Sequence, residues 1–321
     1  MRFVVCLAVL LFAAPPAFAA NPTEVAPKAA APSKAPELRF AWPVPSRVTV
    51  TERILKGGKR AVVRYDAVLS ARQGGGYQLR TEGFQFLELD GRDLTKGAPP
   101  SELQAAAAVA GVIPTLLLSA EGDVVDVVGM EEAIENLVAL VPQERGLRDQ
   151  MRKVWSQPAV AQTLKTKGAS FWRVWVETWV GIEMAANEER SGVIREQLLS
   201  WSVDSAVTIR HRGPDARQKG AVRLELETVL EGEPFRKAMA GVLSQTMPAV
   251  PETRGMDFDA MVKSARRVTL LEVVTDAATL RPYSARISQV VKLQIEDKQR
   301  DEHEEHEYSF AWPAQKPGKR R

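Results

Sequence analysis

Residues Ala169–Met184 read ASFWRVWVETWVGIEM and hold three of the chain's seven tryptophans. These tryptophans are Trp172, Trp175 and Trp179, with Val176 and Ile182 alongside. On a helix their spacing of i, i+3 and i+7 forms a single stripe. On a strand, Arg173 and Glu177 would fall on the tryptophan face, which is a poor surface to bury. The pattern therefore favours a helix, with Arg173 and Glu177 paired on its flank.

The tryptophan stripe needs a large apolar partner, because each aromatic side chain removes roughly 150–250 Å² from water when it is buried. Two interpretations follow. The helix is the core helix of one domain, or it forms one wall of an apolar ligand chamber. On the second interpretation the candidate ligand-binding residues are Trp172, Trp175, Val176, Trp179 and Ile182.

Segments with strand-like alternation lie on both sides of this helix, joined by glycine-containing turns typical of antiparallel hairpins. They include Arg47–Leu55, Arg60–Ala71, Tyr77–Leu89, Ala221–Leu230, Tyr283–Glu296 and Asp301–Trp312. Helical periods occur at Ser101–Ala110, Ala133–Val141, Glu144–Leu164 and Pro234–Gln245. We predict an α+β fold in which a single strongly curved antiparallel sheet of about 8–10 strands wraps a central block of helices, like a half-barrel.

The N-terminal residues 1–19 have the charged start, the short apolar run and the A-x-A site of a secretory signal peptide cleaved after Ala19. Residues 20–37 are rich in alanine and proline and are expected to form a disordered linker. We expect one folded domain over residues 38–313 and a basic disordered tail over 314–321. No later stretch approaches the roughly 20 apolar residues of a membrane-spanning helix. The protein is therefore expected to be exported and soluble, in the periplasm or outside the cell.

The composition excludes several classes of chemistry. The chain's single cysteine, Cys6, lies within the predicted signal peptide, so the mature chain has no disulfide, thiolate nucleophile or cysteine-ligated zinc. The 43 Lys and Arg residues nearly balance 40 Asp and Glu residues. This balance lacks the basic excess of a nucleic-acid-binding protein.

The string FAWP occurs twice, at Phe40–Pro43 and at Phe310–Pro313. Two copies of four residues do not make a repeat. They mark first and last strands that meet, each stopped by proline, or they coincide by chance.

The acidic string Asp301–Tyr308 contains His303 and His306 and is the most tempting metal site. Residues three apart on a strand point to opposite faces, so these two histidines cannot share one ion. We predict a solvated, charged edge strand here and no metal site.

No catalytic constellation is predicted. His211 precedes a turn, and no Gly-x-Ser-x-Gly motif positions a nucleophile. Glu177 and Glu183 are the acidic groups in an aromatic setting, and general acid–base work needs such a setting. Ion pairing or solvation on the helix flank is the alternative role for them. We expect no enzyme activity and no cofactor.

A cysteine-free exported chain with a long antiparallel sheet interrupted by helices resembles the periplasmic lipoprotein carriers of the LolA and LppX type over Leu38–Trp312. The resemblance implies a curved sheet around helices with an apolar cavity for acyl chains, and it carries no site residues. We therefore expect a non-enzymatic envelope protein that binds a lipid or lipoprotein acyl chain. The alternative is a structural or interaction protein with a filled core.

Overall fold

The computed structural model describes residues 35, 37–96, 115–139, 148–149, 152, 162, 165–166, 168–198, 200–246 and 256–313. The predicted signal peptide, nearly all of the predicted linker and the predicted basic tail lie outside these residues. The helix predicted at Ser101–Ala110 and most of the one predicted at Glu144–Leu164 also lie outside them.

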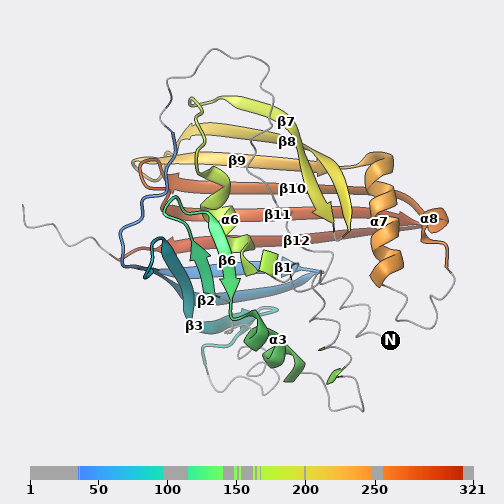
Figure 1. The fold of residues 1–321 in the computed structure, drawn as a ribbon, viewed down its shortest axis with the longest axis horizontal. Coiled ribbons are helices and arrows are strands. Elements are labelled where there is room, and N and C mark those ends of the chain that lie inside the picture. Colours follow the sequence, from blue (N-terminus) through green and yellow to red (C-terminus); the bar gives the residue numbers. More distant parts are fainter. Residues whose placement is uncertain are drawn as a thin grey trace, which may run out of the picture.

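The described chain is organised as one antiparallel sheet of 12 strands, in the order β6-β5-β3-β2-β1-β12-β11-β10-β9-β8-β7, with β4 paired to β3 (Figure 1). The strands are β1 (Ser46–Lys56), β2 (Lys59–Ala71), β3 (Tyr77–Leu89), β4 (Arg92–Asp93), β5 (Thr115–Leu118), β6 (Val124–Val128), β7 (Glu189–Leu198), β8 (Trp201–Pro214), β9 (Ala221–Leu230), β10 (Val262–Asp276), β11 (Pro282–Ile295) and β12 (Lys298–Ala311). Most neighbours in the sheet are also neighbours in the chain, because short turns favour hairpins.

The predicted half-barrel around a block of helices is wrong. The sheet is larger than predicted and remains open, with β6 and β7 at its edges. The described helices are short: α3 (Met130–Ala139), α6 (Ser170–Trp175), the 3₁₀ turn η1 (Glu177–Trp179), α7 (Gly232–Thr246) and α8 (Phe258–Met261). Figure 1 shows α6 and α7 over opposite ends of the strands rather than together at a centre. None of the described helices has both the length and the apolar character needed to cross a lipid bilayer.

The first and last long strands meet, as the two FAWP strings suggested. β1 pairs with β12 from Thr49↔Ala311 to Lys56↔Glu304. The rings of Trp42 and Trp312 lie edge to face with centroids 4.9 Å apart. The first FAWP string precedes β1 rather than lying within it.

The position of β12 corrects a second prediction. It lies between β1 and β11 in the middle of the sheet and is not an edge strand. Its first residues, 298–303, are exposed, whereas Glu304, Glu305 and His306 pair with side chains of neighbouring strands. On one face, for example, Arg286 of β11 pairs with Glu305 at 2.9 Å and with Glu272 of β10 at 3.1 Å.

The two faces of the sheet differ in polarity. The face with Arg286 carries cross-strand ion pairs, and Arg210 there contacts Glu189 and Glu227 in the same way. The opposite face, here called the inner face, carries the apolar core and is covered by α6 and α7. This one-sided burial is usual for antiparallel sheets, whose strands alternate apolar and polar residues.

Two apolar clusters cover most of the inner face, and a third, Ala240, Leu243, Phe258 and Val262, joins α7 to α8 and to the start of β10. The tryptophan cluster surrounds α6 and η1 and includes Trp172, Trp175, Trp179, Phe40, Trp42, Val50, Leu226, Leu271, Ile287 and Tyr308. The α7 cluster consists of Val203, Leu230, Phe235, Ala238, Met239 and Ala265, with Leu198 and Leu293 packed against it.

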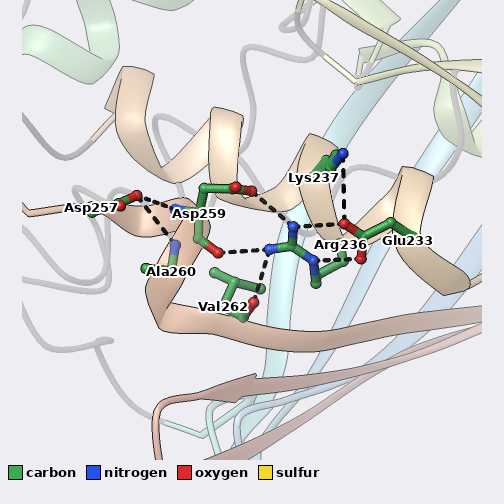
Figure 2. A network of polar contacts seen from close by, with 7 residues as sticks. All are labelled: Glu233, Arg236, Lys237, Asp257, Asp259, Ala260 and Val262. Atoms are coloured by element: carbon green, nitrogen blue, oxygen red, sulfur yellow. Dashed lines mark hydrogen bonds and ion pairs between the residues drawn. The ribbon is translucent and has the colours of Figure 1, made fainter.

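Helix α7 is fixed at two points. Arg236 donates to the carbonyl oxygens of Asp259 (2.7 Å) and Val262 (3.0 Å) and pairs with the carboxylates of Glu233 and Asp259 (Figure 2). These contacts attach α7 to α8 and to the start of β10. At the other point, Gly241 lies so close to the Trp201 ring that a Cβ there would overlap it.

The contact between Gly241 and Trp201 predicts that Gly241→Ala has opposite effects on the free energy of unfolding with and without the Trp201 ring. We expect Gly241→Ala to lower the free energy of unfolding by about 1–2 kcal/mol, because the methyl group must displace the indole. In a Trp201→Ala background the same substitution should raise the free energy of unfolding by up to about 1 kcal/mol, because alanine is the better helix former. Urea unfolding of the four proteins measures both effects. Equal effects in the two backgrounds would contradict the packing described here.

A buried polar band as the candidate functional site

The predicted helix over Ala169–Met184 is shorter than expected. It ends at Trp175, continues as the η1 turn to Trp179 and is extended at Val180, before Gly181 with a φ of +77°. The backbone at Val176 (φ −140°) already departs from the helix. The three indoles nevertheless all point into the core and are fully buried. The tryptophan stripe is therefore a property of a helix followed by a turn.

Two of the three indoles, those of Trp172 and Trp175, pack against other aromatic rings. Trp172 lies edge to face with Phe40 and Trp42, and Trp175 contacts Tyr308 and Phe310 in the same way. Both FAWP strings thus contribute to the tryptophan cluster.

Hydrogen bonds fix two of the three rings. Trp172 donates to the carbonyl of Gly122 and Trp179 to that of Val174, each at 2.8 Å. Trp175 Nε1 has no hydrogen-bond partner among the described residues. Val176 is also buried, whereas Ile182 is half-buried. That these residues line a ligand chamber stays a prediction.

Glu177 has a structural position. It pairs with Arg173 at 3.0 Å, which confirms the predicted flank pair, and it accepts from the backbone N–H of Val124 at 3.2 Å. Burial raises the pKa of Glu177, while the charge of Arg173 opposes the shift. The carboxylate therefore joins η1 to strand β6. Glu183 is exposed.

A band of polar side chains crosses the inner face, and no sequence pattern pointed to it. On β7–β11 its members lie between residues of the tryptophan cluster and residues of the α7 cluster, and it continues onto β12 and β1. We call this set the polar band. It consists of Glu196, Ser205, Thr228, Arg267, Thr269, Gln289, Glu304, His306 and Glu52.

The strand register places the centre of the band in one straight row. Glu304 pairs with Gln289, Gln289 with Thr269, and Thr269 with Thr228. Residues directly opposite on adjacent strands lie on the same face, with their Cβ atoms about 4.5–5.5 Å apart. Gln289, Thr269 and Thr228 are 4%, 1% and 1% exposed, so this row is buried as deeply as the apolar residues beside it.

One end of the band is a cluster of charged groups at the junction of β1 and β12. His306 contacts Glu52 at 2.7 Å and Glu304 at 3.1 Å, and Lys56 contacts Glu304 at 2.9 Å. Burial alone would lower the pKa of His306, but its hydrogen bonds to the two carboxylates outweigh burial and raise the pKa to about 9. Burial and the charge of Glu52 raise the pKa of Tyr308 well above its usual value. His306 is thus protonated at neutral pH and balances the two acids together with Lys56.

The other end of the band is an ion pair between Arg267 of β10 and Glu196 of β7, which spans β9 and β8. Their side chains are 5% and 1% exposed. Two buried oxygens in this part of the band, Glu196 Oε1 and Thr269 Oγ1, have no hydrogen-bond partner within the described ranges. Such atoms are uncommon in folded interiors, where the great majority of buried polar groups are paired.

The two histidines of the acidic string lie on opposite faces, as predicted. His306 belongs to the inner cluster, whereas His303 contacts Ser288 and Glu305 on the outer face. Across the described residues, no group of three or more His, Cys, Asp and Glu side chains is arranged to hold a metal ion. His211 lies in β8 and is buried, and its Nδ1 accepts from the backbone N–H of Gly213 at 3.0 Å, at the irregularity near the end of that strand.

Comparisons with known proteins add little. Neither a protein-family model nor a curated protein sequence matches the chain. A solved structure described as "lipid-protein interactions in lipovitellin" is similar, with a TM-score of 0.41 and 9% sequence identity. The alignment covers 85% of this chain and 26% of the lipovitellin chain, so this chain spans about a quarter of that protein's length. At this TM-score the likeness carries no argument about function, and the resemblance to lipoprotein carriers stays a prediction.

The His306 cluster predicts a pH dependence of stability. The pKa of His306 is raised from 6.5 to about 9 in the folded protein. The contribution of His306 to the free energy of unfolding is therefore fully present below about pH 6.5 and is lost as the pH rises through about 9. We expect this contribution to be about 1–3 kcal/mol. Urea unfolding at about pH 6 and pH 10 should show a larger loss for the native sequence than for His306→Gln. The matched control His303→Gln, on the outer face, should keep the native profile. Identical profiles for all three proteins would contradict the assignment.

Because Arg267 and Glu196 form a buried ion pair, we expect substitutions of the two residues to have strongly non-additive effects on the free energy of unfolding. We expect Arg267→Met alone to cost about 3–5 kcal/mol of unfolding free energy, because it leaves a buried carboxylate without its cation. Combining it with Glu196→Leu should recover most of that loss. A double-mutant cycle from urea unfolding measures the coupling. If the two costs simply added, the pair would not be the buried interaction described here.

Proposed function

We propose that this chain is a non-enzymatic protein that binds a mostly apolar ligand, a lipid or an acyl chain, between the inner face of the sheet and the helices. The observation that carries the proposal is the polar band between two apolar clusters. Ligand sites for hydrophobic molecules are lined mainly by apolar side chains with a few polar groups that fix orientation. The inner face has this distribution at its centre.

The arrangement suits an amphipathic molecule better than a purely apolar one. Two rows lie side by side on the inner face: Leu226, Leu271 and Ile287, and Thr228, Thr269 and Gln289. On each strand the two residues are two positions apart and therefore point to the same face. A hydrocarbon chain would contact the first row, while its polar end would contact the second. The apolar row and the polar row thus lie on the same face of the same three strands.

Export is part of the proposal and rests on residues 1–19 alone. If they act as a signal peptide, the ligand would be an envelope lipid or a lipoprotein acyl chain. Mass spectrometry of protein produced from the full gene, with its lipid extract, would test both points. The expected findings are a mature N-terminus at Ala20 and a co-purified lipid.

A protein-interaction role is the alternative, and the edges of the sheet favour it. Val193 on edge strand β7 is 56% exposed and Val125 on edge strand β6 is 61% exposed. Edge strands offer unpaired backbone groups to another chain. A second strand bound to β7 would protect its outward N–H groups from hydrogen exchange in the presence of a partner but not alone.

Binding of an acyl chain distinguishes the two functions. Titration with a pyrene-labelled acyl ester should give saturable energy transfer from the protein's tryptophans. Thr228→Phe should weaken binding by at least about tenfold, because it fills the centre of the inner face. Val229→Phe, on the opposite face of the same strand, is the matched control and should bind like the native protein. Absence of saturable binding by the native protein would leave the interaction role.

A further inference from the structure

We infer that the polar end of the ligand is uncharged, an ester or hydroxyl head as in a neutral glycerolipid, and that it is held by Thr228, Thr269 and Gln289. This inference rests on the proposed function and names the class of ligand. Three properties of the polar band support a neutral head: the uncharged side chains at its centre, the paired charges at its two ends, and the hydroxyl group of Thr269, which has no partner among the described residues.

The centre of the band is uncharged and can both donate and accept hydrogen bonds. Thr228, Thr269 and Gln289 provide two hydroxyl groups and one carboxamide in direct register on β9, β10 and β11. Strands are about 4.8 Å apart, so the three side chains span about 10 Å, which is the scale of a glycerol ester. An ester carbonyl needs donors and a free hydroxyl needs both donors and acceptors. This set offers both.

The ends of the band disfavour a charged head. Arg267, His306 and Lys56 are the cations that border the centre, and each already contacts a carboxylate, from Glu196, Glu52 or Glu304. A fatty-acid carboxylate would have to compete with an existing partner or remain buried without a counter-ion. Either outcome is costly, because a buried charge is tolerated only when it is paired. A neutral head incurs no such cost.

Thr269 provides the specific contact point. Its Oγ1 is buried and has no hydrogen-bond partner among the described residues. A hydroxyl group in this state destabilises the protein alone and gains a partner when a ligand oxygen approaches. Replacing it by valine, which has nearly the same shape, should therefore keep or increase stability while weakening binding. A purely structural threonine would not show this opposite pair of effects.

The same strand offers a matched control. Thr275 Oγ1 is also buried and without a partner in the described part of the chain. It lies on the inner face of β10 six residues from Thr269, beyond Leu271 and Val273 of the tryptophan cluster and away from the polar band. Thr275→Val thus removes an equivalent hydroxyl from outside the proposed site.

The test compares a fatty alcohol, its monoacylglycerol counterpart and the fatty acid of the same chain length by displacement of the pyrene-labelled ester from the full protein. We expect the two neutral ligands to bind at least about tenfold more tightly than the fatty acid near neutral pH. Thr269→Val should remove most of this preference, with an unfolding midpoint equal to or above the native one. Gln289→Leu should act in the same direction, and Thr275→Val should leave the preference unchanged.

The outcomes separate the inference from the function on which it rests. Equal or tighter binding of the fatty acid would overturn the neutral head while the binding function stands. Equal effects of Thr269→Val and Thr275→Val would also overturn the assigned site. Failure of every ligand, including the pyrene ester, would remove the proposed function and the inference together.

Discussion

Antiparallel pairing of β1 with β12 is the contact on which the remaining structure depends. It joins strands that are about as far apart in the chain as the described residues allow, and it converts two meanders into one sheet. Trp42 and Trp312 seal the junction, and their indole N–H groups donate to the carbonyls of Leu280 and Pro282 at 3.0 and 2.7 Å. Both bonds end at the β10–β11 turn, so the two FAWP strings are held by the same few residues. The junction also brings Glu52 to His306, which completes the charged end of the polar band.

The polar band is the feature of this sheet that packing alone does not explain. Burying hydroxyl, amide and charged groups costs free energy unless each is paired, and replacing a buried ion pair by apolar residues is often neutral or stabilising. An inner face built only for stability would therefore continue the leucines of β9 and β10 across the centre. Instead, the apolar residues of the inner face are interrupted on each strand from β7 to β11 between the same two clusters, in direct register on β9, β10 and β11. Coincidence of position on successive strands points to a common role.

Much of the fold could be predicted from sequence because its signals are local. Alternation and glycine turns located Tyr77–Leu89 and Ala221–Leu230 with their observed bounds. The end of α6 was missed because the tryptophan spacing fits a longer helix, whereas Trp172 donates to the distant carbonyl of Gly122 and Trp179 donates back to the carbonyl of Val174. The central place of β12 was missed because a charged strand looks like an edge until its partners are known. The polar band was missed for a related reason: Thr228 or Thr269 alone is one polar residue in an apolar strand, and only the register aligns them.

The tryptophan cluster and the polar band of the inner face differ in the interactions that hold their side chains. The tryptophan cluster is held by ring contacts and by hydrogen bonds from indoles to backbone carbonyls, which fix its geometry. The polar band contains two buried oxygens that have no hydrogen-bond partner within the described residues, Thr269 Oγ1 and Glu196 Oε1. The ring contacts of the tryptophan cluster lie on one side of the band, and on the other side Arg236 attaches α7 to α8 and to the start of β10. If the proposed ligand binds at the band, an inner face already ordered by these contacts would lower the cost of ordering the bound molecule, and hydrogen bonds at the band would contribute to specificity.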